Sequence, residues 1–331
     1  MKKLYFLTLL SICSMGYSQV TLPHYDGLDY ATGAALQTQT GWTTLNTGDD
    51  LAIIAGSLNY TGLQASTGNK LAFGGAGIDA GKDFTSQTTG TVYFSTLLNV
   101  TDLTATTSTT GGYIAGFVQG TSSSFGGTLW LNKVSESTFN IGVNPRTTAA
   151  NTIYSTTTYN TNTTYLVVIS YTFVDGTGND IVKIWINPSS LGATEPTASA
   201  TATNAGTDLT SVGRLLIRQG SSTDTPNVEL DEFRIGTTWA DVTPQATASV
   251  NDNAIAGLKI YPNPNTGNTL YVTSDVIGDK SVIIFDVLGK QILTVSNVTD
   301  NGINIGNLKA GIYMVKVSQD GKSATRKLVV Q

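Results

Sequence analysis

The sequence contains almost no cysteine or histidine and few charged residues. Of its 331 residues, one is cysteine (Cys13), one is histidine (His24) and 12% are charged, about half the charged share of an ordinary soluble domain. Without further cysteine, the chain after Cys13 has no disulfides, no thiolate metal sites and no cysteine nucleophile. A catalytic triad built on His24 would stand close to the expected mature N-terminus, a region that is often poorly ordered.

Several catalytic and cofactor-binding motifs are also missing. The sequence has no nucleophile elbow, no His-Glu-x-x-His, no phosphate loop and no dinucleotide fingerprint. Residues 19–253 carry 8 Lys and Arg against 18 Asp and Glu, a net charge of −10, which makes nucleic acid and anionic lipid poor partners. Residues 254–331 carry 8 against 5, a net charge of +3, and this change of sign predicts a second, independent domain.

Long apolar runs are absent except near the start. Lys2 and Lys3 precede an apolar run over 4–13, and small or polar residues follow, the pattern of a secretory signal peptide. The run is too short to span a bilayer. A lipoprotein signal ending at Cys13 is the alternative, but Ile12 stands where that family has Gly, Ala or Ser. We therefore expect a signal peptide over 1–18 and no transmembrane segment in the mature chain.

The patterns that the sequence does contain predict an all-β protein. Short alternating apolar runs between Gly-rich and polar turns indicate strands, and no helix pattern exceeds three turns. Glycine and asparagine at 175–180 predict a tight reversal, and Asp320-Gly321 predicts a hairpin turn after the inward-facing Tyr313, Val315 and Val317. The expected strands lie at 91–100, 112–119, 127–134, 138–143, 164–174, 180–188, 211–219 and 228–235.

The number of strands favours one double-sheet jelly roll over two small domains. The polar, unpatterned stretch that follows it marks a linker, and a small immunoglobulin-like β-sandwich comes last. The expected organisation is a signal peptide (1–18), a jelly roll (19–243), a linker (244–256) and a C-terminal domain (257–331).

The C-terminal part carries several short motifs in order. They include the segments 258–264, 285–290, 308–313 and 327–330. Together they resemble the type A C-terminal sorting domain of the type IX secretion system of Bacteroidetes. That resemblance implies export across the outer membrane, the secretion machinery as a partner, and release or attachment at the cell surface. The residues that carry the sorting signal are Tyr261, Pro262, Asn263, Pro264, Gly289, Lys290, Gly311, Tyr313 and Lys327.

The main module has a resemblance of its own. Tyr25-Asp26-Gly27, the run 165–168 leading to 185–188, and above all the closing segment 229–239 are similar to the laminin-G-like, concanavalin A-like jelly rolls of exported Bacteroidetes proteins. The resemblance implies a fold and a tendency to bind glycans or other surface polymers. It implies no defined ligand, because the same fold also serves glycanases and structural modules.

A glycanase would need two carboxyl groups flanking the scissile bond. Glu229 and Asp231 fit the first two positions of the Glu-x-Asp-x-Glu strand of some concanavalin A-like glycanases, but Phe233 or Arg234 occupies the third. The alternative is that Asp231 and Glu232 accept hydrogen bonds from backbone amides or from Arg234. That second interpretation makes this segment structural.

A glycan binder needs apolar rings beside polar groups. Alternation places Trp130 and Trp185 on the more polar faces of their strands. If these strands share a sheet, Trp130 and Trp185 with Lys183 and Arg218 line a groove. Otherwise loops or a second sheet cover both rings.

Calcium is the one cofactor that the composition of the chain does not exclude. Oxygen ligands at Asp49-Asp50, or at Asp175 and Asp180, could bind it, although solvated turns have the same composition. Neither stretch has the spacing of an EF-hand loop.

We interpret the protein as a secreted or cell-surface, non-catalytic binding or adhesion protein that recognises an extracellular glycan or surface polymer. The alternatives are a divergent glycan hydrolase using Glu229 and Asp231, and a structural surface or matrix component. A binder should show an exposed aromatic groove, a hydrolase two carboxyl groups facing each other across a cleft, and a matrix protein neither.

Overall fold

The structure is a computed structural model that describes residues 19–121, 123–204, 206–246, 255–275, 278–298 and 302–331. The predicted signal peptide (1–18) and most of the predicted linker (247–254) lie outside the described residues. The chain divides between residues 247 and 248 into two compact units, and both are all-β, as predicted. No helix in the described ranges has the length and apolar character needed to cross a bilayer.

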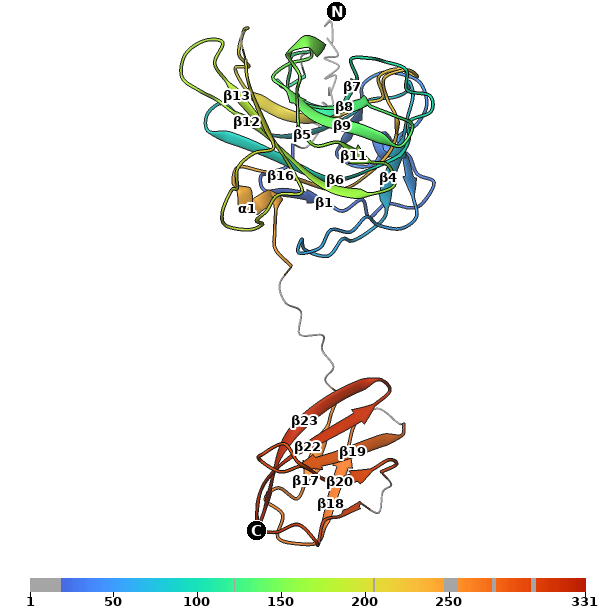
Figure 1. Ribbon diagram of the computed structural model, residues 1–331, viewed down its shortest axis with the longest axis vertical. Helices are drawn as coiled ribbons and strands as arrows, with labels where there is room; N and C mark the ends of the chain where they lie inside the picture. Colours follow the sequence, from blue (N-terminus) through green and yellow to red (C-terminus); the bar gives the residue numbers. More distant parts are fainter. Residues whose placement is uncertain (1–18, 122, 205, 247–254, 276–277, 299–301) are drawn as a thin grey trace, which may run out of the picture. The chain divides into compact units, whose positions relative to one another are not determined.

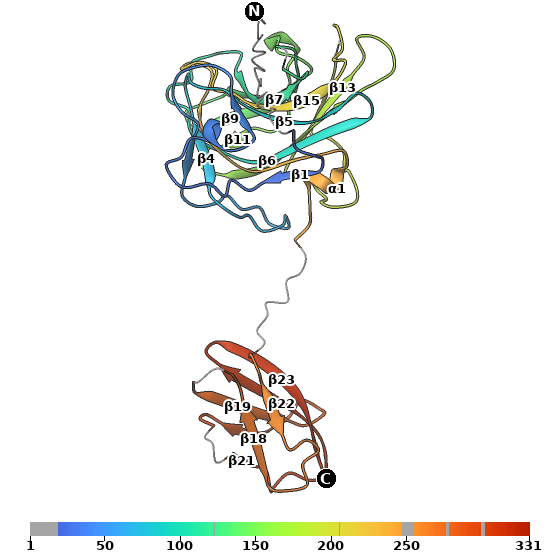
Figure 2. The same cartoon turned by 180° about the vertical axis from the view of Figure 1, so that it is seen from behind.

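The first unit is a jelly roll of two antiparallel eight-stranded sheets (Figures 1 and 2). The first sheet has the order β14-β13-β12-β6-β16-β4-β3, with β1 also paired to β16. Its strands are β1 (His24–Asp26), β3 (Ala52–Ile54), β4 (Lys70–Phe73), β6 (Thr91–Asp102), β12 (Thr164–Thr172), β13 (Ile181–Ile186), β14 (Ala200–Thr203) and β16 (Asn227–Gly236).

The second sheet has the order β10-β9-β8-β7-β15-β5-β2, with β11 also paired to β9. All eight strands predicted for the jelly roll are present, four in each sheet. The strands of the second sheet are β2 (Trp42–Thr44), β5 (Ala80–Gln87), β7 (Gly112–Val118), β8 (Phe125–Lys133), β9 (Thr138–Asn144), β10 (Ile153–Tyr154), β11 (Tyr159–Asn160) and β15 (Val212–Ile217).

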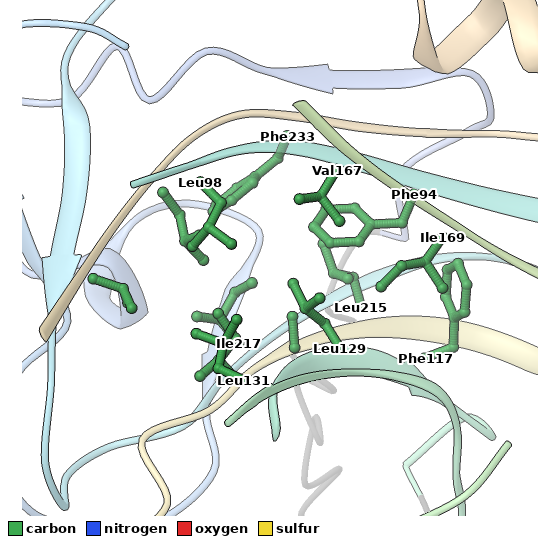
Figure 3. Close-up of a cluster of buried hydrophobic side chains, with 14 of the residues drawn as sticks. Phe94, Leu98, Phe117, Leu129, Leu131, Val167, Ile169, Leu215, Ile217 and Phe233 are labelled. Atoms are coloured by element: carbon green, nitrogen blue, oxygen red, sulfur yellow. The ribbon is translucent and has the colours of Figure 1, made fainter. Parts of the chain in front are cut away.

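The core of the jelly roll lies between the two sheets (Figure 3). Alternate residues of each strand point into it because successive side chains of a strand face opposite ways. The first sheet contributes Phe94, Leu98, Val167, Ile169 and Phe233, and the second contributes Phe117, Leu129, Leu131, Leu215 and Ile217.

A second apolar cluster covers the outer face of the first sheet. Trp185 of β13 packs against Trp239, with ring centroids 5.0 Å apart. Trp239 begins the short helix α1 (Trp239–Val242), where the Thr238 side chain accepts from the Asp241 amide and the Asp241 side chain accepts from the Thr238 amide. This reciprocal capping box fixes the helix that seals this face.

The second unit is a small sandwich of a three-stranded sheet, β17-β18-β21, and a four-stranded sheet, β20-β19-β22-β23. As predicted, Asp320 and Gly321 form the turn between β22 and β23, both with positive φ, and Val315 and Val317 point into the core. The strands are β17 (Lys259–Tyr261), β18 (Thr269–Thr273), β19 (Lys280–Phe285), β20 (Gln291–Val295), β21 (Ile303–Asn304), β22 (Gly311–Gln319) and β23 (Lys322–Val330).

One predicted turn differs in length. β12 and β13 do pair as a hairpin, but residues 173–180 join them as a long loop in place of a tight reversal. The Asp180 carboxylate accepts from the Val174 amide at 2.8 Å and from the Tyr171 hydroxyl at 2.5 Å. The Asp180 carboxylate therefore connects the two ends of this loop.

Candidate functional site

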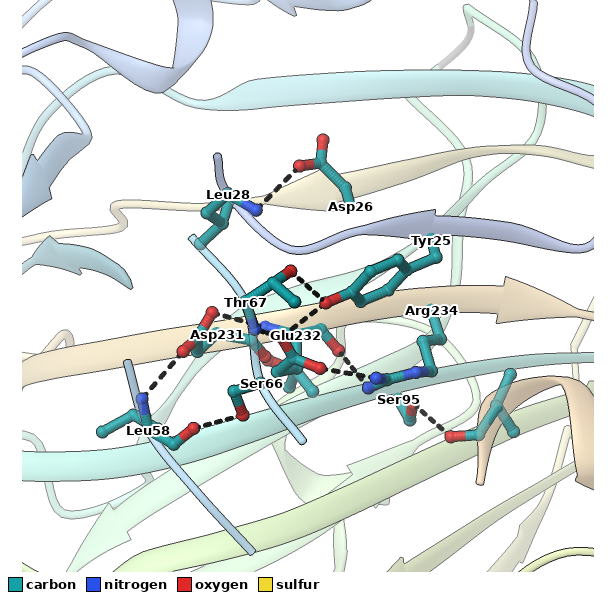
Figure 4. A network of polar contacts seen from close by, with 12 residues as sticks. Tyr25, Asp26, Leu28, Leu58, Ser66, Thr67, Ser95, Asp231, Glu232 and Arg234 are labelled. Atoms are coloured by element: carbon teal, nitrogen blue, oxygen red, sulfur yellow. Dashed lines mark hydrogen bonds and ion pairs between the residues drawn. The ribbon is translucent and has the colours of Figure 1, made fainter. Parts of the chain in front are cut away.

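The candidate catalytic carboxyl groups on β16, Glu229 and Asp231, are engaged in structural contacts. Asp231 is fully buried and accepts from the amides of Leu58 and Glu232, each at 2.8 Å (Figure 4). Glu229 forms an ion pair with Lys70 at 2.8 Å and accepts from Asn99 at 2.9 Å. The two groups do not face each other across an open cleft, so the geometry does not support the hydrolase alternative.

A β-bulge at Glu232 explains this arrangement. The register against β6 shifts between Asp231 and Arg234, and Glu232 has a φ of 59°. The strand is therefore irregular, and Asp231 and Glu232 both contact the loop over 55–69. Glu232 accepts from the Thr67 amide at 3.0 Å, the Tyr25 hydroxyl at 2.7 Å and Arg234 at 2.5 Å. These contacts match the second interpretation, in which Asp231 and Glu232 accept hydrogen bonds from backbone amides and from Arg234.

Burial raises the pKa of Asp231 to about 7. The neighbouring Glu232 adds to this shift, while the hydrogen bonds from the Leu58 and Glu232 amides and the charge of Arg234 oppose it. The shift follows from removing a carboxylate from water, and it marks a carboxyl group that fixes a loop to the sheet.

The two candidate tryptophans do not share a sheet, which corrects the predicted groove. Trp130 lies on β8 of the second sheet and Trp185 on β13 of the first, and they are only 4% and 1% exposed. Alternation did place both on the faces opposite the core, where Trp130 donates to the Thr128 hydroxyl at 2.8 Å and Trp185 to the Pro196 carbonyl at 2.8 Å. The groove fails because loops and neighbouring rings cover each indole.

The two basic side chains of the predicted groove, Lys183 and Arg218, lie near different tryptophans. Lys183 lies beside Trp185, with Nζ 5.8 Å from the ring centroid, and pairs with Glu195 at 3.1 Å. Arg218, just after β15, stacks on the half-buried Tyr113 ring at 4.1 Å, and the Trp130 ring lies 5.6 Å from the same tyrosine. The structure therefore joins Trp130 with Arg218 and Trp185 with Lys183, and does not bring the four together.

The jelly roll has an open cavity of about 720 Å³ among its loops, which we call the loop cavity. Three loops form it: 88–90 after β5, 173–180 between β12 and β13, and 206–210 between β14 and β15. The half-buried Phe173 ring and the exposed Asp175 side chain contribute to its lining. The hydroxyl-bearing side chains in the lining are Thr88, Thr89, Thr177, Thr207 and Thr210.

One carboxylate ties two of these loops together. Asp208 accepts from the amides of Gly178 at 2.5 Å and of Asn179 and Asp180 at 3.3 Å, and from the Asn204 side chain at 2.7 Å. Burial acts to raise the pKa of Asp208, but these hydrogen bonds outweigh it and lower the pKa. Because its bonds reach backbone amides of a different loop, Asp208 holds the two loops in a fixed arrangement.

The candidate calcium ligands do not form a shared site. Asp180 is buried, with its carboxylate engaged by Tyr171 and Val174, whereas Asp175 is exposed on the cavity rim. Asp50 accepts from Gln37 at 2.5 Å, and Asp49 is exposed beside it. Within the part of the chain that the structure describes, no group of three or more His, Cys, Asp or Glu side chains could hold a metal ion.

Sequence reasoning missed Phe173, Asp208 and the threonines of the loop cavity. Asp175, a predicted calcium ligand, does lie in one of the three loops that form the cavity. Phe173 lies at the end of the predicted strand 164–174, and an aromatic residue at a strand end could have been considered as a ligand contact. Nothing in the sequence shows that residues 206–210 approach it.

In the C-terminal unit, motifs distant in sequence meet. The Asn263 side chain donates to the Lys327 carbonyl at 2.7 Å and accepts from the Val329 amide at 3.0 Å, which fixes the segment after β17 to β23. Residues 259–331 match the secretion system C-terminal sorting domain. The type IX sorting domain expected at this end of the chain is thereby shown, and the match begins two residues after the predicted start at residue 257.

Other residues of the sorting domain occupy turns and strand starts. Gly289 has a φ of 82° in the turn between β19 and β20, a conformation that favours glycine, and Lys290 next to it is exposed. Tyr313, after the first residues of β22, donates its hydroxyl to the Lys309 carbonyl at 2.8 Å. The peptide bonds before Pro262 and Pro264 are both cis, and Tyr261 stacks on Tyr271 at 5.5 Å.

Among solved structures, the chain is similar to the CBM2 module of the evolved Dit of Lactobacillus casei BL23 phage J-1, with 12% identity over 66% of this chain and 95% of that one and a TM-score of 0.33. It is also similar to the botulinum neurotoxin serotype G binding domain, with 10% identity, coverages of 84% and 69% and a TM-score of 0.35. TM-scores this low define neither a common family nor a common ligand. No curated protein matches the chain.

Proposed function

We propose that the protein is exported by the type IX machinery through its sorting domain, and that its jelly roll then binds a glycan at the cell surface or in the medium without cleaving it. The loop cavity carries this proposal. Its volume of about 720 Å³ lies within the range of small-ligand sites, roughly 300–1,000 Å³. Its loops are held in place by Asp208 before binding.

The lining of the loop cavity matches the chemistry of a sugar. A sugar presents CH faces that pack on an aromatic ring, and Phe173 supplies one. Its hydroxyls need donors and acceptors, which the five threonines supply. The Asp175 side chain makes no hydrogen bond or ion pair within the described residues, so its oxygens are free to accept from a ligand. The acidic residues of this cavity and the net charge of −10 over residues 19–253 favour a neutral glycan over a sulfated or uronic one.

The cavity is suited to binding and not to hydrolysis. Glycoside hydrolysis uses two carboxyl groups placed on either side of the scissile bond. Asp180 and Asp208 are engaged by Tyr171 and by backbone amides, which leaves Asp175 as the single free carboxylate of the lining. A purely structural matrix component would have no use for a preorganised cavity, so the cavity favours the binding interpretation over that alternative.

A glycan array on the mature chain, residues 19–331, with and without calcium, tests the binding. We expect saturable binding to a neutral glycan, unchanged by calcium removal. Phe173→Ala and Asp175→Asn should each weaken it at least tenfold, about 1.4 kcal/mol. Tyr154→Ala, which removes a half-buried ring of the second sheet, and Glu136→Gln, which neutralises an exposed carboxylate, are the matched controls and should bind as the wild type does.

Two results would overturn this function. Absence of binding to every glycan on the array would move the assignment to a structural matrix component. Release of reducing sugar from a bound glycan, lost in Glu229→Gln, would establish the hydrolase in its place.

A further inference from the structure

The four-stranded sheet of the sorting domain is apolar on its inner face and carries a cluster of apolar side chains on part of its outer face. Its inner face is the domain core, with Val282, Ile284, Val315, Val317 and Leu328 nearly or fully buried. Because side chains alternate, the residues between them point outward. We call this surface the outer sorting face, and it consists of Ile283 and Phe285 of β19, Ile312 and Met314 of β22, and Val329 of β23.

The strand register makes the outer sorting face continuous. Phe285 lies opposite Met314, and Ile312 lies opposite Val329 in the next row. Ile312 and Met314 are 46% and 40% exposed, and the adjoining turn presents Leu288, which is 90% exposed. An antiparallel sheet with one buried face ordinarily presents polar side chains to water on the other, and a continuous exposed apolar patch marks an interaction surface.

Charge indicates what kind of partner fits. Lys327 lies opposite Met314, and Lys316 lies opposite Ile283, both on the outward side of their strands. Residues 254–331 carry a net charge of +3. A complementary partner therefore presents an apolar surface bordered by carboxylates, since opposite potentials across an interface steer and orient association.

We propose that the export machinery recognises the sorting domain through the outer sorting face, by a protein surface that is apolar at its centre and acidic at its rim. This inference rests on the export proposed above. The assignment to the machinery follows from the sorting-domain match of residues 259–331, which makes recognition during export the task of this unit. Met314, between Phe285 and Lys327 in the register, is the central contact.

The test expresses the full-length chain in a bacterium that carries the type IX system and measures the fraction that leaves the periplasm. Met314→Asp and Ile312→Asp should each lower that fraction about tenfold or more, the effect of losing one interface anchor. Met314→Leu should restore export. Thr273→Asp, which adds the same charge at an exposed position of β18 in the other sheet, is the matched control and should be exported normally.

Each outcome decides something different. Normal export of Met314→Asp, or an equal loss in Thr273→Asp, would overturn the outer sorting face as the recognised surface. A wild-type dimer in solution that Met314→Asp converts to monomer, with export unchanged, would assign the face to self-association. Export of a chain ending at residue 256 would overturn the proposed export route itself. Thermal unfolding of each purified variant at the wild-type temperature confirms that the substitutions leave the fold intact.

Discussion

Arg234 and Glu232, two residues apart on β16, form an ion pair that water does not reach. Their side chains are 3% and 0% exposed, and Arg234 Nη2 lies 2.5 Å from Glu232 Oε2. The same glutamate also binds Tyr25 and the amide of Thr67 (Figure 4). One carboxylate therefore connects the N-terminal strand, the loop over 55–69 and the bulge of β16, and this set of contacts closes one face of the first sheet.

Removing one charge of this pair should be costly. Glu232→Gln keeps the shape of the side chain but leaves the Arg234 charge buried without a counter-charge, which should lower the free energy of unfolding by about 3–5 kcal/mol. Denaturant unfolding of the mature chain measures this. Glu136→Gln breaks an ion pair whose glutamate side chain is 70% exposed and should cost less than about 1 kcal/mol. Equal effects of the two substitutions would contradict the assignment.

The stability of the jelly roll should depend on pH through Asp231. Its pKa is raised to about 7 in the folded protein, against about 3.9 in an unfolded chain. Between these values the folded state holds the proton more tightly, so stability falls as the pH rises from 4 to 7. Asp231→Asn cannot titrate. The wild type should therefore lose stability relative to this variant across that range, as measured by unfolding at several pH values. A constant difference between them would refute the shift.

Trp185 should matter for stability and not for ligand binding. Its indole is 1% exposed, donates to the Pro196 carbonyl and packs on Trp239. Trp185→Ala should lower the free energy of unfolding by about 3–5 kcal/mol, while Trp185→Phe, which retains a ring, should cost less. Binding titrations under fully native conditions should give the wild-type affinity for both. A loss of affinity in the stable Trp185→Phe variant would restore a ligand-binding role.

Strands and turns governed by local chemistry were predictable from the sequence. Asp320 and Gly321 supply the two positive φ values that a hairpin turn needs. The alternation of Tyr313, Val315 and Val317 predicts which face of the strand is buried. β5 was missed because its sequence, AGKDFTSQ, is mostly small or polar. It forms because Ala80 and Phe84 reach the core and Lys82 pairs internally with Asp26 at 3.1 Å. That pairing depends on a residue 56 positions away.

The candidate site was less predictable because sheet membership is a long-range property. Alternation put Trp130 and Trp185 opposite the core, but it says nothing about which strands pair, and the pairing placed them in different sheets. The loop cavity needs three connections to converge, and the contact that unites two of them runs from Asp208 to the amides of 178–180. Backbone amides are present at almost every residue, so the sequence does not show which of them a carboxylate such as that of Asp208 will bind.

The bonds that hold the loop cavity also determine how this protein could diversify. Asp208 and Asp180 fix the loops through backbone amides and through the Tyr171 hydroxyl. The threonine side chains of the lining are not needed to hold the loops in place. Thr88, Thr177 and Thr207 can therefore change identity while the loops keep their course and the core stays as it is. If the loop cavity is the glycan site proposed above, substitutions at these threonines should change which glycan is bound without changing the fold.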